Sequence, residues 1–184
     1  MVGVYVDDLL MMSASEHLIK NFKRMLSQKS QITDKGELQE FLGIVVDRKD
    51  GNMTLSQARM IDKLLADHGT LNCHGSKTPK STTVDLNESK DSTEGEVCQY
   101  QSIFGSLMYI AGSTRPDVQN ATNKLAQYMS APTTIHLNAA TRVLKYLKET
   151  RNAKLVYKNN GRDDLEIYTD VISQMQTTLV QCLV

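Results

Sequence analysis

The sequence has little of three features that would each point to a class of protein. Lys plus Arg and Asp plus Glu number 21 each, so the 184-residue chain carries no net charge. It therefore lacks the basic excess of proteins that bind nucleic acid on their own. No apolar run approaches the ~20 residues of a membrane-spanning helix, so we expect no membrane partner. The cysteines, Cys73, Cys98 and Cys182, form an odd, scattered set that predicts a reduced, intracellular setting.

The most informative segment that is present is Tyr5-Val6-Asp7-Asp8. Apolar runs flank it on both sides, a pattern that predicts a strand, a tight turn with the acids at its tip, and a returning strand. Two adjacent carboxylates repel each other, and a bound divalent cation would remove that repulsion. The alternative is that Asp7 and Asp8 simply favour a turn, and the four residues alone favour this interpretation because short motifs often match by chance.

A second β-hairpin and several helices are predicted further along the chain. The β-branched run Ile44–Val46, the turn at residues 49–52 and the alternating run Met53–Ser56 predict the hairpin. Gly43 inside the strand pattern predicts a bulge or a close approach of another backbone. Apolar residues at helical spacing predict helices after Ser15, after Gln57, around residues 103–111, from Pro116 to Pro132, and from Thr134 to Leu147.

Composition divides the chain into five segments. Both hairpins and a helix fall within residues 1–69, and residues 70–99 form a polar linker or long surface loop. Residues 100–150 are mostly helical, residues 151–170 contain two short strand-like runs, and residues 171–184 show no clean period. The fold class predicted from this order is α+β, with two β-hairpins packed with helices and followed by a mostly helical region.

Seven short motifs occur in the order found in one family. They are Tyr5–Asp8, Gly36–Leu38, Phe41–Ile44, Leu55–Gln57, Gly105–Tyr109, Thr114–Asp117 and Tyr146–Thr150. Each motif is weak alone, but in this order they resemble the reverse transcriptase of copia-type LTR retrotransposons, over residues 2 to about 170. The resemblance implies a partial polymerase palm followed by a thumb and connection region.

The resemblance implies that the first hairpin is the palm turn on which carboxylates bind two divalent metals, Mg²⁺ or Mn²⁺, for nucleotidyl transfer. Asp7 would be the stronger metal ligand, Asp8 the supporting one, and Tyr5 would lie near the primer end. The second hairpin resembles the primer grip; an ordinary edge hairpin packed on the palm is the alternative. Its implied primer-binding residues are Leu42, Gly43 and Ile44 on one strand and Leu55 and Gln57 on the other.

The resemblance also implies partners and a location. An RNA or DNA template–primer, deoxynucleoside triphosphates and the remainder of a Pol polyprotein would be the partners, in the cytoplasm or nucleus. Leu165–Asp170 resembles the opening strand of the RNase H domain that follows in this family, and Asp170 matches its first metal-binding Asp. The Trp-Ala-Gly sequence that normally follows is missing, so we expect no nuclease activity and interpret Asp170 as a relic.

In the family, the fingers and the first half of the palm, with another catalytic Asp, precede the segment that matches Met1. We therefore expect a fragment that binds metal weakly or not at all and is inactive alone. A non-catalytic transposon relic, or a reused nucleic-acid or protein interaction module, would share the same sequence. A palm-type nucleotide cyclase also places acids on a hairpin, but it has no use for the second hairpin or for Thr114–Asp117.

Overall fold

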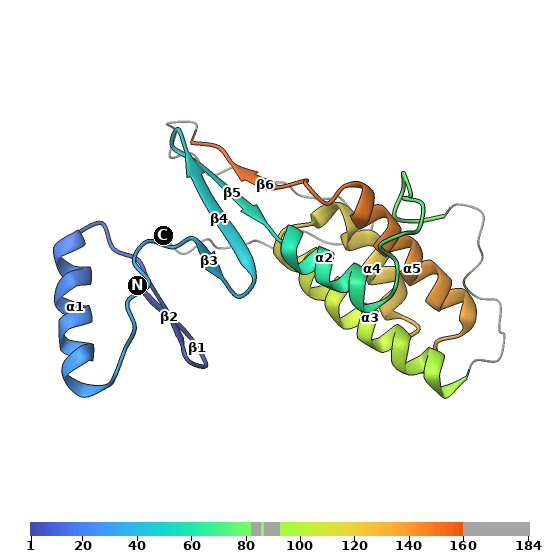
Figure 1. Cartoon of the computed structure of the whole chain (residues 1–184), viewed down its shortest axis with the longest axis horizontal. Coiled ribbons are helices and arrows are strands. Elements are labelled where there is room, and N and C mark those ends of the chain that lie inside the picture. The colour runs from blue at the N-terminus through green and yellow to red at the C-terminus, as the bar shows by residue number, and fades with distance from the viewer. Residues whose placement is uncertain (82–85, 87–92, 160–184) are drawn as a thin grey trace, which may run out of the picture.

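The structure is a computed structural model, and it describes residues 1–81, 86 and 93–159. Figure 1 shows the first hairpin with one helix at one end of the molecule, a bundle of helices at the other end, and a small sheet between them. The α+β class predicted from the sequence is confirmed, with two antiparallel sheets. No helix in the described part of the chain is long and apolar enough to cross a membrane.

The first hairpin forms where the sequence predicts it. Strands β1 (Val2–Tyr5) and β2 (Asp8–Met11) pair antiparallel, with Tyr5 opposite Asp8. This register leaves Val6 and Asp7 as a two-residue turn. Helix α1 (Glu16–Lys29) follows and, like β1, buries none of its residues.

The second sheet has four antiparallel strands in the order β3-β4-β5-β6. Their bounds are Glu40–Phe41 for β3, Ile44–Lys49 for β4, Asn52–Ser56 for β5 and Leu155–Tyr157 for β6. Two of the connections are two-residue turns, Leu42-Gly43 and Asp50-Gly51, in which both residues have positive φ. This backbone matches the twist of a tight hairpin and favours Gly at the second position. Leu42 and Gly43 were predicted on a strand; that prediction is wrong, because they form the β3–β4 turn.

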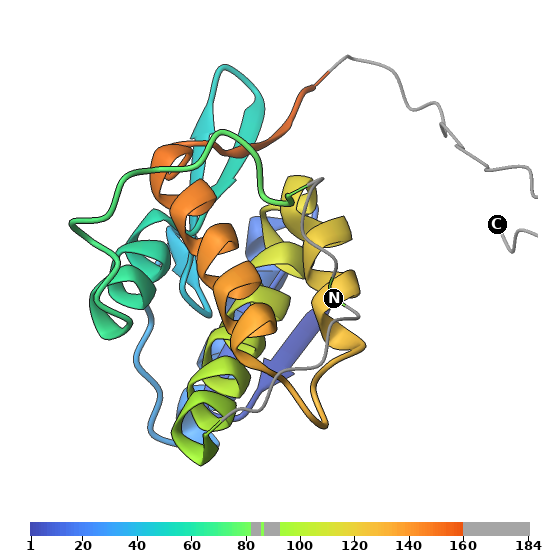
Figure 2. The same ribbon diagram turned by 90° about the vertical axis from the view of Figure 1, so that its right-hand side faces the viewer.

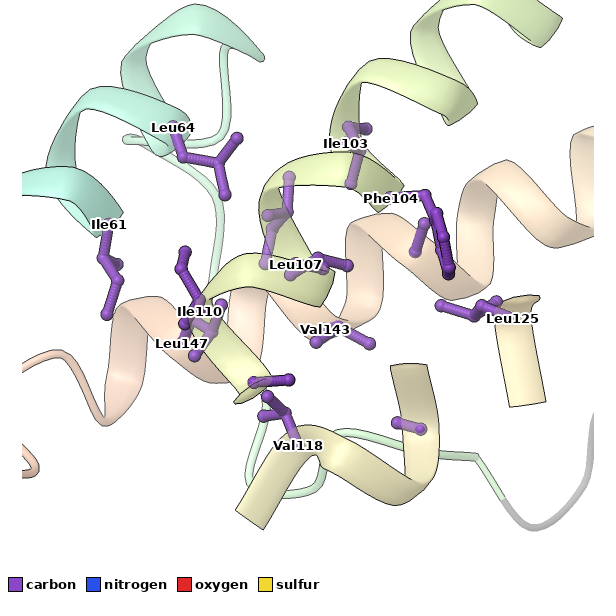
Figure 3. Close-up of a cluster of buried hydrophobic side chains, with 14 of the residues drawn as sticks. Ile61, Leu64, Ile103, Phe104, Leu107, Ile110, Val118, Leu125, Val143 and Leu147 are labelled. Carbon is purple, nitrogen blue, oxygen red and sulfur yellow. The ribbon is translucent and has the colours of Figure 1, made fainter. Parts of the chain in front are cut away.

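The helical bundle contains the core of the described residues. Its helices are α2 (Ala58–Asp67), α3 (Glu94–Ser113), the 3₁₀ turn η1 (Pro116–Val118), α4 (Gln119–Ala126) and α5 (Thr134–Glu149). Figure 3 shows apolar side chains from α2, α3, η1, α4 and α5 meeting between the helices. Burying one Leu or Ile fully stabilises a fold by roughly 1.5–3 kcal/mol. The bundle therefore supplies the main apolar stabilisation of the described structure.

Two features of the second half differ from what the sequence suggests. Helix α3 begins at Glu94, inside the segment predicted as linker, because Thr93 and Glu96 form a capping box. Strand β6 pairs with β5, with Met53 opposite Tyr157, so part of residues 151–170 extends the second sheet. Asp170 lies outside the described residues.

Candidate functional site

The acidic turn of the first hairpin has a strained backbone. Val6 has a φ of 49°, a left-handed conformation that costs a β-branched residue about 1–3 kcal/mol. In this turn Asp7 lies at the tip, where its side chain is exposed. Asp8 begins β2, and its side chain is half-exposed. It forms a long ion pair with Lys35, in which Nζ lies 3.5 Å from Oδ1.

These two carboxylates offer the hard oxygen ligands that Mg²⁺ and Mn²⁺ prefer. They are adjacent, solvent-accessible and next to one weakly paired lysine, so their donor set fits a divalent cation. Within residues 1–81, 86 and 93–159, no group of three or more His, Cys, Asp or Glu side chains is arranged to hold a metal ion. Among the described residues, Asp7 and Asp8 can therefore supply only part of a metal shell.

The apolar residues around the acidic turn are open to solvent. Tyr5 is 57% exposed, and Val4 and Val6 are 71% and 81% exposed. Tyr5 stands opposite Asp8 in the register, so the two side chains extend from the same face of the hairpin. The hairpin tip therefore presents an aromatic ring and two carboxylates together on an accessible surface.

The residues predicted to contact a primer on the second hairpin lie in three different environments. The Leu42-Gly43 turn is held to α3, because the hydroxyl of Tyr109 donates a 2.7 Å hydrogen bond to the carbonyl oxygen of Leu42. Ile44 and Leu55 are half-buried on β4 and β5. The structure thus brings Leu42, Gly43 and Ile44 together at one end of the sheet and attaches that end to the bundle.

Gln57 differs from the other members of that set because it is buried. It lies at the N-terminal cap position of α2 and is 2% exposed. Its amide oxygen accepts a 2.8 Å hydrogen bond from the hydroxyl of Thr114, and its amide nitrogen lies 3.5 Å from the sulfur of Met60. A side chain with these partners holds α2 against the end of α3 and is not on the surface.

An ion pair that the sequence analysis missed lies within Thr114–Asp117, and its buried arginine also contacts Tyr146–Thr150. Arg115 is 2% exposed and forms a two-pronged contact with Asp117, with Nε to Oδ1 at 2.9 Å and Nη2 to Oδ2 at 2.7 Å. Its Nη1 also donates to the carbonyl oxygen of Thr150 at the end of α5, at 3.1 Å, where a cation is favoured by the helix dipole. The spacing Arg-Pro-Asp was the available signal, since Pro fixes the backbone between the two charges.

Electrostatics around this pair follow from the same contacts. Burial raises the pKa of Asp117, but hydrogen bonds from Arg115 and Tyr146 outweigh it and leave the pKa below its usual value. The Tyr146 hydroxyl donates to Asp117 Oδ2 at 2.9 Å, and burial together with that bond raises the pKa of Tyr146. The Arg115 guanidinium also lies over the Tyr146 ring, 5.7 Å from its centre. The arrangement stabilises a local structure and offers no free nucleophile.

The motifs quoted from the sequence therefore meet in pairs. Phe41–Ile44 contacts Gly105–Tyr109 through Leu42 and Tyr109, and Leu55–Gln57 contacts Thr114–Asp117 through Gln57 and Thr114. Thr114–Asp117 in turn contacts Tyr146–Thr150 through Arg115 and Asp117. Five of the seven motifs thus fix the second hairpin on the helical bundle, and Tyr5–Asp8 presents two adjacent carboxylates at a turn.

Comparison with known proteins identifies the family. Residues 1–82 match the family described as reverse transcriptase (RNA-dependent DNA polymerase). The chain is 36% identical over 167 residues to the retrovirus-related Pol polyprotein from transposon RE1 of Arabidopsis thaliana, covering 91% of this chain and 11% of the polyprotein. The comparison with solved structures gives no significant match.

The chain covers a larger share of two shorter relatives. The chain is 31% identical over 170 residues to the putative transposon Ty5-1 protein YCL074W of Saccharomyces cerevisiae, which is 92% of this chain and 55% of that protein. It is 30% identical over 168 residues to the uncharacterized mitochondrial protein AtMg00810 of Arabidopsis thaliana, which is 91% of this chain and 69% of that protein. The chain thus belongs to the reverse transcriptase family of copia-type retrotransposons.

Proposed function

We propose that the chain forms the part of an RNA-directed DNA polymerase that holds catalytic metal and positions the primer. Asp7 would be the stronger metal ligand and Asp8 the supporting one, with Mg²⁺ or Mn²⁺ as the ion. When bound, such ions supply Lewis-acid chemistry for transfer of a nucleotide to a primer 3′ hydroxyl. The observation that carries the proposal is the strained two-residue turn, which presents two adjacent carboxylates and Tyr5 on an open surface in a chain of this family.

The primer-positioning role is assigned to the second hairpin. The hydrogen bonds from Tyr109 to Leu42 and from Thr114 to Gln57 both hold the end of this element that is away from the Asp50-Gly51 turn. A rigid support is what orienting a substrate hydroxyl requires, because a displacement of about 1 Å can cost 100-fold in rate. Leu42, Gly43, Ile44 and Leu55 would face the primer, whereas Gln57 acts as a positioning residue from its buried site.

The proposed partners are an RNA or DNA template–primer, deoxynucleoside triphosphates and other segments of a Pol polyprotein. Exposed apolar side chains on the first hairpin and α1 support a protein partner, with Val4 at 71% and Leu18 at 60% exposure. Large apolar side chains exposed in such numbers are typical of a segment that a partner covers. We propose that other parts of the polymerase cover it.

We further propose that the isolated chain does not extend primers. Asp7 and Asp8 are open to water, and Mg²⁺ held by one or two exposed carboxylates keeps most of its water ligands. The test is a primer-extension assay on the purified chain with Mg²⁺ and with Mn²⁺, beside a variant carrying both Asp7→Asn and Asp8→Asn. Equal background in the two proteins is expected. Template-dependent extension by the unchanged chain above the double variant would overturn this part of the proposal.

The non-catalytic alternative, an interaction module, is favoured by the same exposed apolar residues. It predicts that a partner segment binds the first hairpin whether or not Asp7 and Asp8 are present. The polymerase proposal predicts in addition that metal affinity at the hairpin falls when either residue becomes Asn. Measuring Mn²⁺ binding by the broadening of nuclear magnetic resonance signals from β1 and β2 separates the two functions.

A further inference from the structure

A second candidate site lies on the helical bundle, far from the acidic turn. The loop that follows α2 runs across α5, as Figure 2 shows, and forms with α4 and α5 a half-open pocket of about 650 Å³. This volume falls within the usual range of small-molecule sites. Figure 1 places β1 and β2 at the opposite end of the molecule from α4 and α5.

The loop wall of this cavity is held in place by hydrogen bonds to α5. The backbone N–H of Ser76 donates to the carbonyl oxygen of Lys145 at 3.1 Å, and Arg142 Nη2 donates to the hydroxyl of Thr78 at 2.9 Å. At the base of the loop, Lys148 Nζ donates to the carbonyl oxygen of Cys73 at 2.6 Å. The loop that forms one wall of the cavity is therefore fixed on α5 by these hydrogen bonds.

The charge of the lining has one sign. Its cationic side chains are Lys80 from the loop, Lys124 from α4, and Arg142 and Lys145 from α5. Among the lining residues that the structure describes, there is no Asp or Glu. None of the four cations forms an ion pair with a carboxylate in the described part of the chain. Four cations around one cavity repel each other, and an anion inside it would offset that repulsion.

Arg142 is the one of these four cations that has a buried donor without an acceptor among the described residues. It is half-buried, its Nη2 donates to the hydroxyl of Thr78, and its buried Nε has no acceptor within the described residues. A guanidinium that is partly removed from water without a counter-charge is costly. Arg is also well suited to phosphate, because its planar donors match phosphate oxygens.

The remaining lining mixes apolar residues with the polar residues His74, Ser76, Ser81, Asn138 and Thr141. Side chains of Leu86, Leu125, Ile135, Ala139 and Val143 contribute to it. An apolar wall with a few convergent charged groups is typical of a site for an organic ligand with a charged end. We propose that this cavity binds a phosphomonoester on a small organic body, of the size of a nucleoside monophosphate.

The ligand chemistry could come from a free mononucleotide or from the phosphorylated 5′ end of a strand, and the test has an arm for each. Isothermal titration of the full chain uses AMP, adenosine, and a trinucleotide with and without a 5′ phosphate. EDTA in the buffer removes metal-dependent binding at Asp7 and Asp8, so the result does not depend on the polymerase proposal. Saturable binding of AMP or of the phosphorylated trinucleotide is expected, without binding of adenosine or of the unphosphorylated trinucleotide.

The variants separate a defined site from general charge attraction. Lys124→Gln and Lys145→Gln should each weaken binding about tenfold, since a bond to a charged group contributes about that factor. The matched control is the pair Lys29→Gln and Lys49→Gln, which removes two exposed cations from α1 and β4 and should leave affinity unchanged. The proposal is overturned if neither phosphate-bearing probe binds, or if the control pair weakens binding as much as the cavity pair does. Circular dichroism of each variant verifies that the fold is retained.

Discussion

The hydroxyl of Thr114 donates a 2.8 Å hydrogen bond to the side-chain oxygen of Gln57, and both residues are 2% exposed. The bond joins the start of α2 to the end of α3 across 57 positions of sequence. It lies directly beyond β5, so it also fixes where the second hairpin leaves the bundle. Gln57 therefore holds the second hairpin in position from a buried site, whereas Leu42, Gly43, Ile44 and Leu55 are half-buried.

Replacement of Thr114 by Val should destabilise the chain by about 1–3 kcal/mol, because a buried amide oxygen loses its donor. Urea unfolding followed by circular dichroism measures this change. Thr122→Val is the matched control. Thr122 is also buried, but its hydroxyl bonds the carbonyl oxygen of Val118, four residues earlier at the start of α4, a local contact that adds little stability. Equal effects of the two substitutions would contradict the assigned role of the Thr114–Gln57 bond.

The ion pair between buried Arg115 and partly exposed Asp117 predicts a pH dependence of stability. The pKa of Asp117 is lowered in the fold from 3.8, so its contribution is fully present above that value. The contribution should disappear as the pH falls from 3.8 through the folded pKa. The difference in unfolding free energy between the unchanged chain and Asp117→Asn should therefore be constant from pH 7 to about 5 and shrink below pH 4.

Asp34→Asn is the control for this titration. Asp34 also has a lowered pKa, from its hydrogen bond with Lys23, but it is fully exposed, where ion pairs contribute little. Its substitution should change stability far less than Asp117→Asn at neutral pH. A difference for Asp117→Asn that does not shrink in acid would show that Asp117 acts through packing rather than charge.

The strain at Val6 predicts a stabilising substitution. Val6→Asn should stabilise the first hairpin by about 1 kcal/mol, because Asn tolerates the left-handed conformation better than a β-branched residue. Hydrogen exchange of the Gly3 and Leu10 amides, on paired residues of β1 and β2, should slow about fivefold. Val4→Asn, which places the same residue on β1, should instead speed exchange, since Asn is disfavoured in strands. Faster exchange in both variants would show that the turn is not strained.

Local sequence patterns predicted much of the fold. Alternating apolar residues located both hairpins, and helical spacing located the helices, because these signals depend on neighbours within a few positions. The β6 strand could not be assigned to the second sheet in this way, since Tyr157 pairs with Met53 from the far end of the chain. The Leu42-Gly43 turn was missed because Phe41 and Ile44 on either side favour strands, and one Gly was the main turn signal.

In the candidate site, too, positions that depend on sequence neighbours were predicted, and positions that depend on distant residues were not. Asp7 and Asp8 are neighbours in sequence, so their common position at a turn could be recognised directly. The environment of Gln57 depends on Thr114, and that of Arg115 depends on Thr150. Contacts across such separations need the packed bundle and are not visible in any single motif.

The metal-ligand role of Asp7 is the central claim, and a chimera tests it most directly. This chain would replace the matching segment of the RE1 Pol polyprotein, and primer extension would be measured with Mg²⁺, with and without Asp7→Asn. The account predicts extension by the chimera and a loss of roughly 100-fold or more with Asp7→Asn, because a missing metal ligand removes several kcal/mol of transition-state stabilisation. Extension that is unchanged by Asp7→Asn would contradict the account.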